Sequence, residues 1–123
     1  MSNADLVLKA LTELFVKRDA SAIERYWSPS YRQHNPEIPD GREHLGALVK
    51  QLPEAFRYEP GLIVADGDHV MVHGRYLGWG PKAILAVDMF RIEGGRLAEH
   101  WDVIQEEIPA AATKSGRPMF TGR

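Results

Sequence analysis

The sequence predicts an α+β domain in which N-terminal helices pack on the concave face of a strongly curved, mostly antiparallel sheet and form a cone-like pocket with it. Apolar residues recur at helical spacing in the first half of the chain, and from about residue 56 onward the period of the pattern changes to two. Helices followed by a run of consecutive strands are typical of a sheet with helices on one face. The length of 123 residues fits one domain, which we expect to span residues 1–123.

Three helices are expected before the sheet. A first amphipathic helix covers residues 4–18, where apolar and charged side chains fall on different faces. A second, short helix ends near Pro29, because proline disfavours helical backbone in the residue before it. Residues 31–40 contain two prolines and are expected to be irregular. A third helix begins at Asp40 and ends at Pro53.

Four strands are expected in the second half of the chain. Alternation of apolar and polar residues, interrupted by turn sequences, places them near residues 56–65, 69–78, 82–92 and 96–105. Residues 106–123 then form an extended C-terminal tail, rich in proline and glycine, to which we assign no element.

The composition argues against several classes of function. The formal net charge is −2 and the basic residues are dispersed, which gives no support for a nucleic-acid partner. The absence of cysteine excludes disulfides and thiol nucleophiles and is typical of a reducing compartment. The N-terminus lacks the pattern of a signal peptide, and the longest apolar stretch near the strands, 83–87, is far too short to cross a bilayer. We therefore expect a cytoplasmic protein without a membrane partner.

The last two strands form a hairpin around two glycines, and its sequence is compatible with two turns. A two-residue loop pairs Glu93 with Arg96. A type I turn with Gly95 left-handed in a bulge pairs Ile92 with Arg96 instead. The choice matters because a shift of one residue moves every side chain of a strand to the other face of the sheet.

We favour the bulged turn because it sorts the side chains by polarity. It pairs Asp88 with His100 and Ala86 with Asp102, so three ionisable groups share one face with small and apolar neighbours. The two-residue loop would place Asp88 and Asp102 on opposite faces. Ionisable groups on a strand face that otherwise has the character of a core indicate a small-molecule site with acid–base chemistry.

The other face of this hairpin is then nearly all apolar. Its residues are Leu85, Val87, Met89, Trp101 and Val103. An apolar sheet face is not stable when left in water, so we expect a homodimer that forms through it. The alternative is that the helices of the same chain cover this face and that the polar face is exposed.

Five motifs spread over the chain carry a resemblance to a known family. They are Tyr31-x-Gln33-His34-Asn35-Pro36, Pro39-Asp40-Gly41-Arg42, Val87-Asp88-Met89-Phe90-Arg91, Glu99-His100-Trp101-Asp102-Val103 and Gly116-Arg117-Pro118-Met119-Phe120. Together they resemble the SnoaL-like polyketide cyclase branch of the nuclear transport factor two-like superfamily. The resemblance implies a cone-shaped α+β fold, usually dimeric. It further implies ring closure by intramolecular aldol condensation, with a pocket aspartate as general acid/base and no metal or organic cofactor.

Asp102 matches the pocket aspartate of that family by its position near the end of the last strand. In the functional interpretation Asp102 transfers the proton, while His100 and Asp88 adjust the acid–base strength of Asp102. In the structural interpretation Asp102 is a buried carboxylate satisfied by backbone donors, with His100 bonded to it. Asp88 would then form an ion pair with Arg91 or Arg75 at the surface of the sheet.

Five further residues are expected to bind the substrate. His34 and Asn35 lie in a proline-bounded loop and can donate hydrogen bonds to a substrate oxyanion, although an asparagine before proline is also a common turn former. Trp27 and Tyr31 precede this loop and would shape the mouth of the pocket. Phe90, on the polar face of the hairpin, would line the wall.

The sequence thus predicts a cofactor-independent enzyme that acts on a small, largely apolar carbonyl compound. Aldol-type cyclisation, isomerisation and dehydration remain open, since all three begin with removal of a proton next to a carbonyl. The superfamily also contains non-catalytic members, so a ligand-binding module and a dimerisation domain are alternatives. A binding module predicts a cavity where the carboxylates do not converge, and a dimerisation domain predicts no cavity of ligand size.

Overall fold

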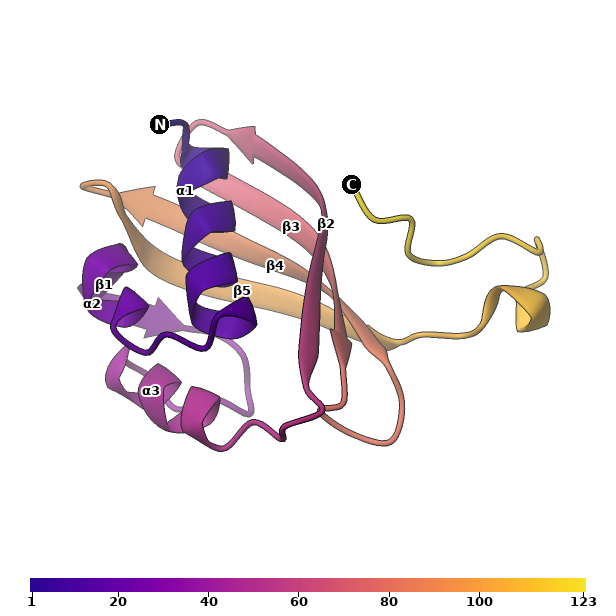
Figure 1. Ribbon diagram of the computed structural model, residues 1–123. Coiled ribbons are helices and arrows are strands. Elements are labelled where there is room, and N and C mark those ends of the chain that lie inside the picture. The colour runs from indigo at the N-terminus through magenta and orange to yellow at the C-terminus, as the bar shows by residue number, and fades with distance from the viewer.

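The computed structural model describes residues 1–123 and confirms the α+β class (Figure 1). The helical elements are α1 (Asn3–Leu11), the π-helical turn η1 (Thr12–Val16), α2 (Ala22–Tyr26), α3 (Glu43–Lys50) and the 3-10 turn η2 (Ala110–Ala112). The strands are β1 (Trp27–Gln33), β2 (Arg57–Asp66), β3 (His69–Leu77), β4 (Ile84–Glu93) and β5 (Arg96–Glu106). No helix is long and apolar enough to cross a membrane.

The five strands form one curved, open sheet in the order β1-β5-β4-β3-β2. Neighbours are antiparallel except for β1 and β5, which run parallel. The sequence analysis missed β1, because it expected a helix up to Pro29 and an irregular segment after it. Proline is tolerated here because β1 lies at the edge of the sheet and its pairing with β5 is irregular between Trp27 and Arg32.

The helices cover the concave face of the sheet, and the core lies between the two layers (Figure 1). Helix α1 begins where the Ser2 hydroxyl accepts the Asp5 N–H at 3.0 Å. Helix α3 begins at Glu43 rather than at Asp40, because the Asp40 carboxylate accepts the backbone N–H of Gln33 at 2.8 Å and so joins the loop to β1.

The β4–β5 hairpin differs from the expected register in two ways. Its turn is the two-residue loop, with Glu93 paired to Arg96 and left-handed backbone at both intervening glycines. The bulge lies in β5 instead, since Arg91 pairs with Glu99 and Ile92 with Leu97, which leaves Ala98 unopposed. The predicted position of the bulge at Gly95 is therefore wrong.

The displaced bulge nevertheless keeps the predicted face. It shifts the ladder by one residue beyond the turn, so Asp88 pairs with Asp102 rather than with His100, and Ala86 pairs with Ile104. The side chains of Asp88 and His100 are buried, with 6% and 7% of their surface exposed, and that of Asp102 has 8% exposed. All three ionisable groups thus lie on the inner side of the sheet, as the sequence predicts.

The C-terminal tail leaves the end of β5, projects from the body and returns to the outer face of the sheet (Figure 1). There the buried Phe120 ring lies 5.5 Å from the His73 ring and 4.8 Å from the Arg75 guanidinium carbon. Gly61 permits this approach, because a Cβ at that position would lie 2.7 Å from the Phe120 ring. The chain itself thus covers part of the outer face next to Leu85, which is buried.

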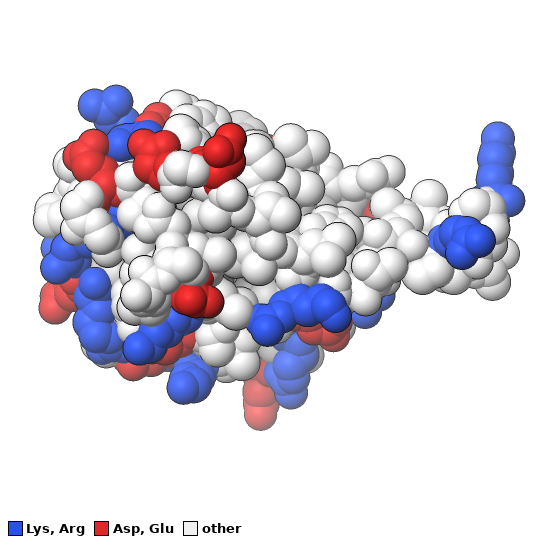
Figure 2. Space-filling model, turned by 90° about the horizontal axis from the view of Figure 1, so that it is seen from above, with Lys and Arg blue, Asp and Glu red and all other residues white.

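Charged side chains are dispersed over the surface. On the face seen in Figure 2, acidic and basic residues are interspersed and no basic stripe forms.

Leu97 tests the importance of the inner face for stability. It is fully buried, so Leu97→Ala should lower the free energy of unfolding by about 2–5 kcal/mol in a urea titration. Leu62→Ala is the matched control, because the Leu62 side chain is exposed, and this change should cost less than about 0.5 kcal/mol. Equal losses in the two variants would contradict the assigned orientation of the sheet.

Candidate functional site

A cavity lies between the helices and the inner face of the sheet. Counted out into the solvent at its mouth, its empty space is about 570 Å³. Most of its lining is apolar, and its apolar and aromatic residues are Leu11, Phe15, Trp27, Tyr31, Ile38, Leu45, Leu48, Tyr76, Trp79, Ile84, Ala86, Phe90 and Ile104. The polar side chains that line it are Gln33, Asn35, Asp88, His100 and Asp102.

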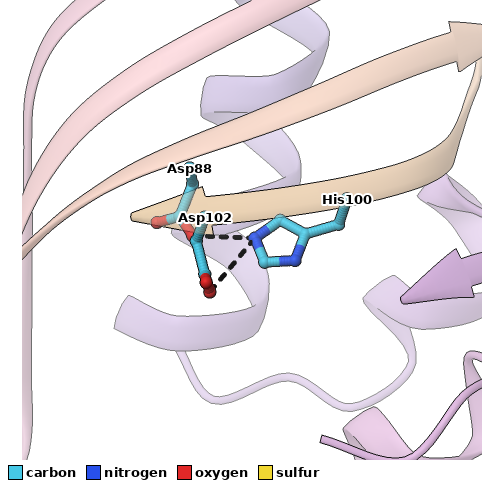
Figure 3. Close-up of side chains that lie close together, drawn as sticks. All are labelled: Asp88, His100 and Asp102. Atoms are coloured by element: carbon cyan, nitrogen blue, oxygen red, sulfur yellow. Dashed lines mark hydrogen bonds and ion pairs between the residues drawn. The ribbon is translucent and has the colours of Figure 1, made fainter. Parts of the chain in front are cut away.

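Three ionisable side chains converge on one wall of this cavity (Figure 3). Asp88 comes from β4, and His100 and Asp102 come from β5. One carboxylate or ring atom of each lies within 4.8 Å of the others. Burying charged groups is costly unless they are paired, so their partners determine which of them can react.

Asp88 and His100 are held in a continuous chain of hydrogen bonds. The Tyr76 hydroxyl donates to Asp88 Oδ2 at 2.6 Å, and burial raises the pKa of that hydroxyl, which keeps it protonated as a donor. Asp88 Oδ1 lies 2.8 Å from His100 Nε2, and His100 Nδ1 lies 2.6 Å from Gln33 Oε1. Both ring nitrogens of His100 and both oxygens of Asp88 are therefore engaged.

The Gln33 amide determines where the histidine carries its proton. Its Oε1 accepts the backbone N–H of Asn35 at 3.0 Å, which identifies that atom as the oxygen and not the nitrogen. His100 Nδ1 must then donate to it and is protonated. A second proton lies between His100 Nε2 and Asp88 Oδ1, so the two groups form either an ion pair or a neutral hydrogen-bonded pair.

Asp102 is held differently. Its Oδ2 accepts the Asn35 side-chain N–H at 2.7 Å and lies 3.8 Å from His100 Nε2. Its Oδ1 makes no hydrogen bond within the chain. Because Asp102 lines the cavity, this oxygen is the one carboxylate atom of the cluster that remains available to a ligand.

The structure brings seven of the eight residues that the sequence analysis assigned to the site to the cavity wall. Trp27, Tyr31, Asn35, Asp88, Phe90, His100 and Asp102 all line it. The expected surface ion pair of Asp88 does not form, because Arg91 binds Glu93 and Glu99 while Arg75 binds Glu59 and Glu107.

His34 is the exception, and its predicted place in the pocket is wrong. Its ring stacks on Trp101 with the centroids 5.0 Å apart, and its Nε2 lies 2.7 Å from Glu99 on the outer face. His34 and then Arg91 lower the pKa of the Glu99 carboxyl. The physical reason is alternation: Gln33 and Asn35 face the cavity, so the residue between them faces away.

Asn35 lines the cavity but is occupied within the chain. Its side-chain N–H donates to Asp102, and its Oδ1 accepts the backbone N–H of Glu37 at 2.7 Å. This residue fixes the aspartate and the loop, and its expected contact with a substrate oxygen stays a prediction.

Two residues that hold the cluster in place were not predicted from the sequence. Gln33 lies within the quoted motif and Tyr76 lies on the inward face of β3, but neither was singled out. The signal for Gln33 was the alternation of Tyr31, Gln33 and Asn35, which an assignment of residues 31–40 as irregular concealed. Tyr76 could have been found by extending the inward face of the predicted strand.

The cluster is also the one group of three side chains that could ligate a metal ion. His100 Nε2 would have to lose its proton and its hydrogen bond with Asp88 before it could bind an ion. The hydrogen-bond partners of His100 and Asp88 fit a proton-sharing pair better than a set of metal ligands.

A family model described as a SnoaL-like domain matches residues 8–100 of this chain. Comparison with the curated proteins gives no match. Among solved structures, TsrD from Streptomyces laurentii is 20% identical with a TM-score of 0.70, and the match covers 84% of this chain and 88% of TsrD.

Two other solved structures show the same arrangement of helices and sheet. A proposed polyketide cyclase from Acidithiobacillus ferrooxidans is 21% identical with a TM-score of 0.70, over 85% of this chain and 89% of that protein. A proposed ketosteroid isomerase from Kribbella flavida is 15% identical with a TM-score of 0.73, over 87% of this chain and 80% of that protein. At such identities the likeness shows the fold alone.

A double-mutant cycle tests the pairing of Asp88 with His100. Asp88→Ala and His100→Ala each leave a buried polar partner unpaired and should each cost about 3 kcal/mol or more of unfolding free energy. The double variant should cost less than the sum by at least about 1 kcal/mol, measured by urea denaturation. The exposed pair Lys82 and Glu106, 3.3 Å apart, is the control and should show little coupling. Additive losses at the buried pair would show that it is not coupled.

Proposed function

This chain belongs to the SnoaL-like domain family, and from that premise we propose that it is a cytoplasmic, cofactor-independent enzyme that acts on a small, apolar carbonyl compound. Asp102 serves as its general acid/base. The absence of cysteine supports the cytoplasmic location.

The observation that carries this proposal is the free Oδ1 of Asp102. A carboxylate oxygen in a mostly apolar cavity, with no donor of its own within the chain, is positioned to accept a proton from a bound ligand. Asn35 holds the other oxygen at 2.7 Å and so fixes the direction of the free one. Asp88 has both oxygens engaged and is a poorer candidate.

The proposed step is the removal of a proton from the carbon next to the ligand's carbonyl group. The C–H bond breaks, the proton goes to Asp102 Oδ1, and the electron pair is delocalised onto the carbonyl oxygen as an enolate. Cyclisation, isomerisation and dehydration each continue from this enolate. Asp102 then returns the proton to the product, so the enzyme is regenerated without an external reagent.

His100 and Asp88 act as positioning residues in this proposal. His100 Nε2 lies 3.8 Å from Asp102 Oδ2, and the Gln33 and Tyr76 contacts fix the ring and its partner carboxylate. These contacts hold the His100 ring and the Asp102 carboxylate in fixed positions relative to each other, as a preorganised site requires.

A ligand-binding module without turnover is the second candidate. It is favoured by the complete engagement of Asp88 and His100 with each other and with Tyr76 and Gln33, which is also what a purely structural cluster would show. The mostly apolar cavity, with carboxylates and a histidine in its wall, weighs against a module that only dimerises.

Solvent exchange into a simple ketone tests the proposed base without knowledge of the natural substrate. With 2-tetralone in D₂O, the wild-type protein should speed deuterium incorporation next to the carbonyl, followed by proton NMR. Asp102→Asn should lower the protein-catalysed rate by about a hundredfold or more, because the general base is lost. Asp66→Asn, at an exposed aspartate, is the matched control and should leave the rate unchanged.

The two candidate functions give different outcomes in this experiment. Binding of 2-tetralone without faster exchange in the wild-type protein would favour the ligand-binding module. Exchange that persists in Asp102→Asn would exclude Asp102 as the base.

We also propose that the protein is a homodimer that forms through the outer face of the sheet. The apolar side chains available there are Met71, Val87, Met89, Trp101 and Val103. Val103 is 65% exposed and Met71 44% exposed, which is costly for apolar groups in a monomer. The C-terminal tail covers only the neighbouring part of this face, around His73 and Arg75.

A charge placed on this face tests the interface. Val103→Glu should convert a dimer into a monomer in sedimentation equilibrium, because a carboxylate would be buried without a partner. Val16→Glu is the control, since Val16 is 50% exposed but lies on η1, among the helices that cover the opposite face of the sheet. A monomeric wild-type protein, or a dimer that tolerates Val103→Glu, would contradict this assembly.

A further inference from the structure

Almost every polar atom in the wall of the cavity has a partner within the chain. Gln33, Asn35, Tyr76, Asp88 and His100 are satisfied by one another and by the backbone. Besides Asp102 Oδ1, two largely buried groups in the wall have unused hydrogen-bonding capacity, and both are donors on β1.

The first is the indole N–H of Trp27. The residue is 1% exposed, and its Nε1 makes no hydrogen bond. A buried donor without an acceptor destabilises the folded protein, so each such atom needs an explanation. Trp27 lines the cavity, where a ligand atom could accept this hydrogen bond.

The second is the hydroxyl proton of Tyr31. The oxygen of this hydroxyl accepts the Gln33 side-chain N–H at 3.2 Å, and no group of the chain accepts its proton. Burial raises the pKa of Tyr31, and the charges of Asp88 and Asp102 add to the rise, so the hydroxyl stays protonated. Trp27 and Tyr31 both lie on β1 and both line the same cavity, and the Trp27 N–H opposes part of this rise.

We propose that Trp27 and Tyr31 together bind the carbonyl oxygen of the ligand. Their two donors lie on β1, and the free oxygen of Asp102 lies on the adjacent strand β5. These unused groups therefore match a compound whose hydrogen-bond acceptor faces β1 and whose neighbouring C–H group faces Asp102 Oδ1. This inference rests on the proposed function and assigns to β1 the oxygen-binding role that the sequence predicted for His34 and Asn35.

The pairing of donors has a chemical consequence. Two hydrogen bonds to one carbonyl oxygen strengthen as negative charge develops on it, so they favour the enolate over the ketone. An ester or amide would present the same acceptor with a less acidic C–H. The site thus selects ketones and aldehydes that carry a hydrogen on the neighbouring carbon.

Acetophenone and α-methylstyrene form the probe pair for this inference, because they have the same shape and differ by C=O against C=CH₂. The wild-type protein should bind acetophenone about tenfold more tightly, as measured by calorimetry or ligand-observed NMR. Tyr31→Phe should remove most of this preference and leave the affinity for α-methylstyrene unchanged. Trp27→Phe should reduce the preference as well.

Tyr58→Phe is the matched control. Tyr58 is another buried tyrosine, 5% exposed, whose hydroxyl has no partner, but it does not line the cavity. Its removal should leave the preference for acetophenone intact. Loss of the preference in Tyr58→Phe to the same extent as in Tyr31→Phe would overturn the proposal, since the effect would then not be local.

A second measurement needs no variant. The carbonyl ¹³C resonance of labelled acetophenone should move downfield on binding to the wild-type protein, because hydrogen bonds withdraw electron density from that carbon. Failure of acetophenone to bind, equal affinity for the two compounds, or an unshifted resonance would each overturn the proposal.

The Asp102→Asn variant separates this inference from the proposed catalysis. It should retain the preference for acetophenone even though it has lost exchange activity. Retention of the preference in Tyr31→Phe would overturn the oxygen site alone, whereas exchange that survives in Asp102→Asn would overturn the base alone.

Discussion

One irregularity of the sheet, the extra residue Ala98 in β5, decides where the ionisable groups lie. The glycine turn sets a two-residue loop, and an unbroken ladder beyond it would place His100 opposite Met89 on the outer face. The bulge changes the alternation between Leu97 and His100, so both side chains face inward. Without it, Asp88 would be a buried carboxylate with no histidine to share its proton.

The two carboxylates of the cluster then receive different environments from their neighbours. Asp88 is bonded by Tyr76 and His100 and has no oxygen left for a ligand. Asp102 is held by Asn35 through one oxygen and offers the other to the cavity. A difference of this kind is how one fold gives two similar groups different chemical roles. The satisfied cluster provides rigidity, and the unsatisfied atoms on β1 and β5 provide the capacity to bind.

The sequence predicted the fold class, the four antiparallel strands and the shared face of Asp88, His100 and Asp102, because these follow from periodicity. It placed the bulge wrongly, since whether a turn or a strand absorbs an extra residue depends on which side chains the core can hold. It missed β1 because Pro29 and Pro36 suppress a strand pattern, which an edge position tolerates.

Within the site, the directions of the side chains could not be predicted from the local sequence. His34 and Asn35 are neighbours in one motif, yet one stacks on Trp101 outside and the other binds Asp102 inside. The partners of Gln33 and Tyr76 come from distant strands and depend on the tertiary structure. Trp27 and Tyr31 were expected to shape the mouth of the pocket, but whether their donors find partners within the chain depends on the tertiary structure.

A crystal structure of the protein with acetophenone bound would test the assignment of the site most directly. We expect the carbonyl oxygen of the ligand within hydrogen-bonding distance of the Tyr31 hydroxyl and its methyl carbon facing Asp102 Oδ1. A ligand seated outside the cavity, or one whose carbonyl group points away from β1, would contradict this assignment.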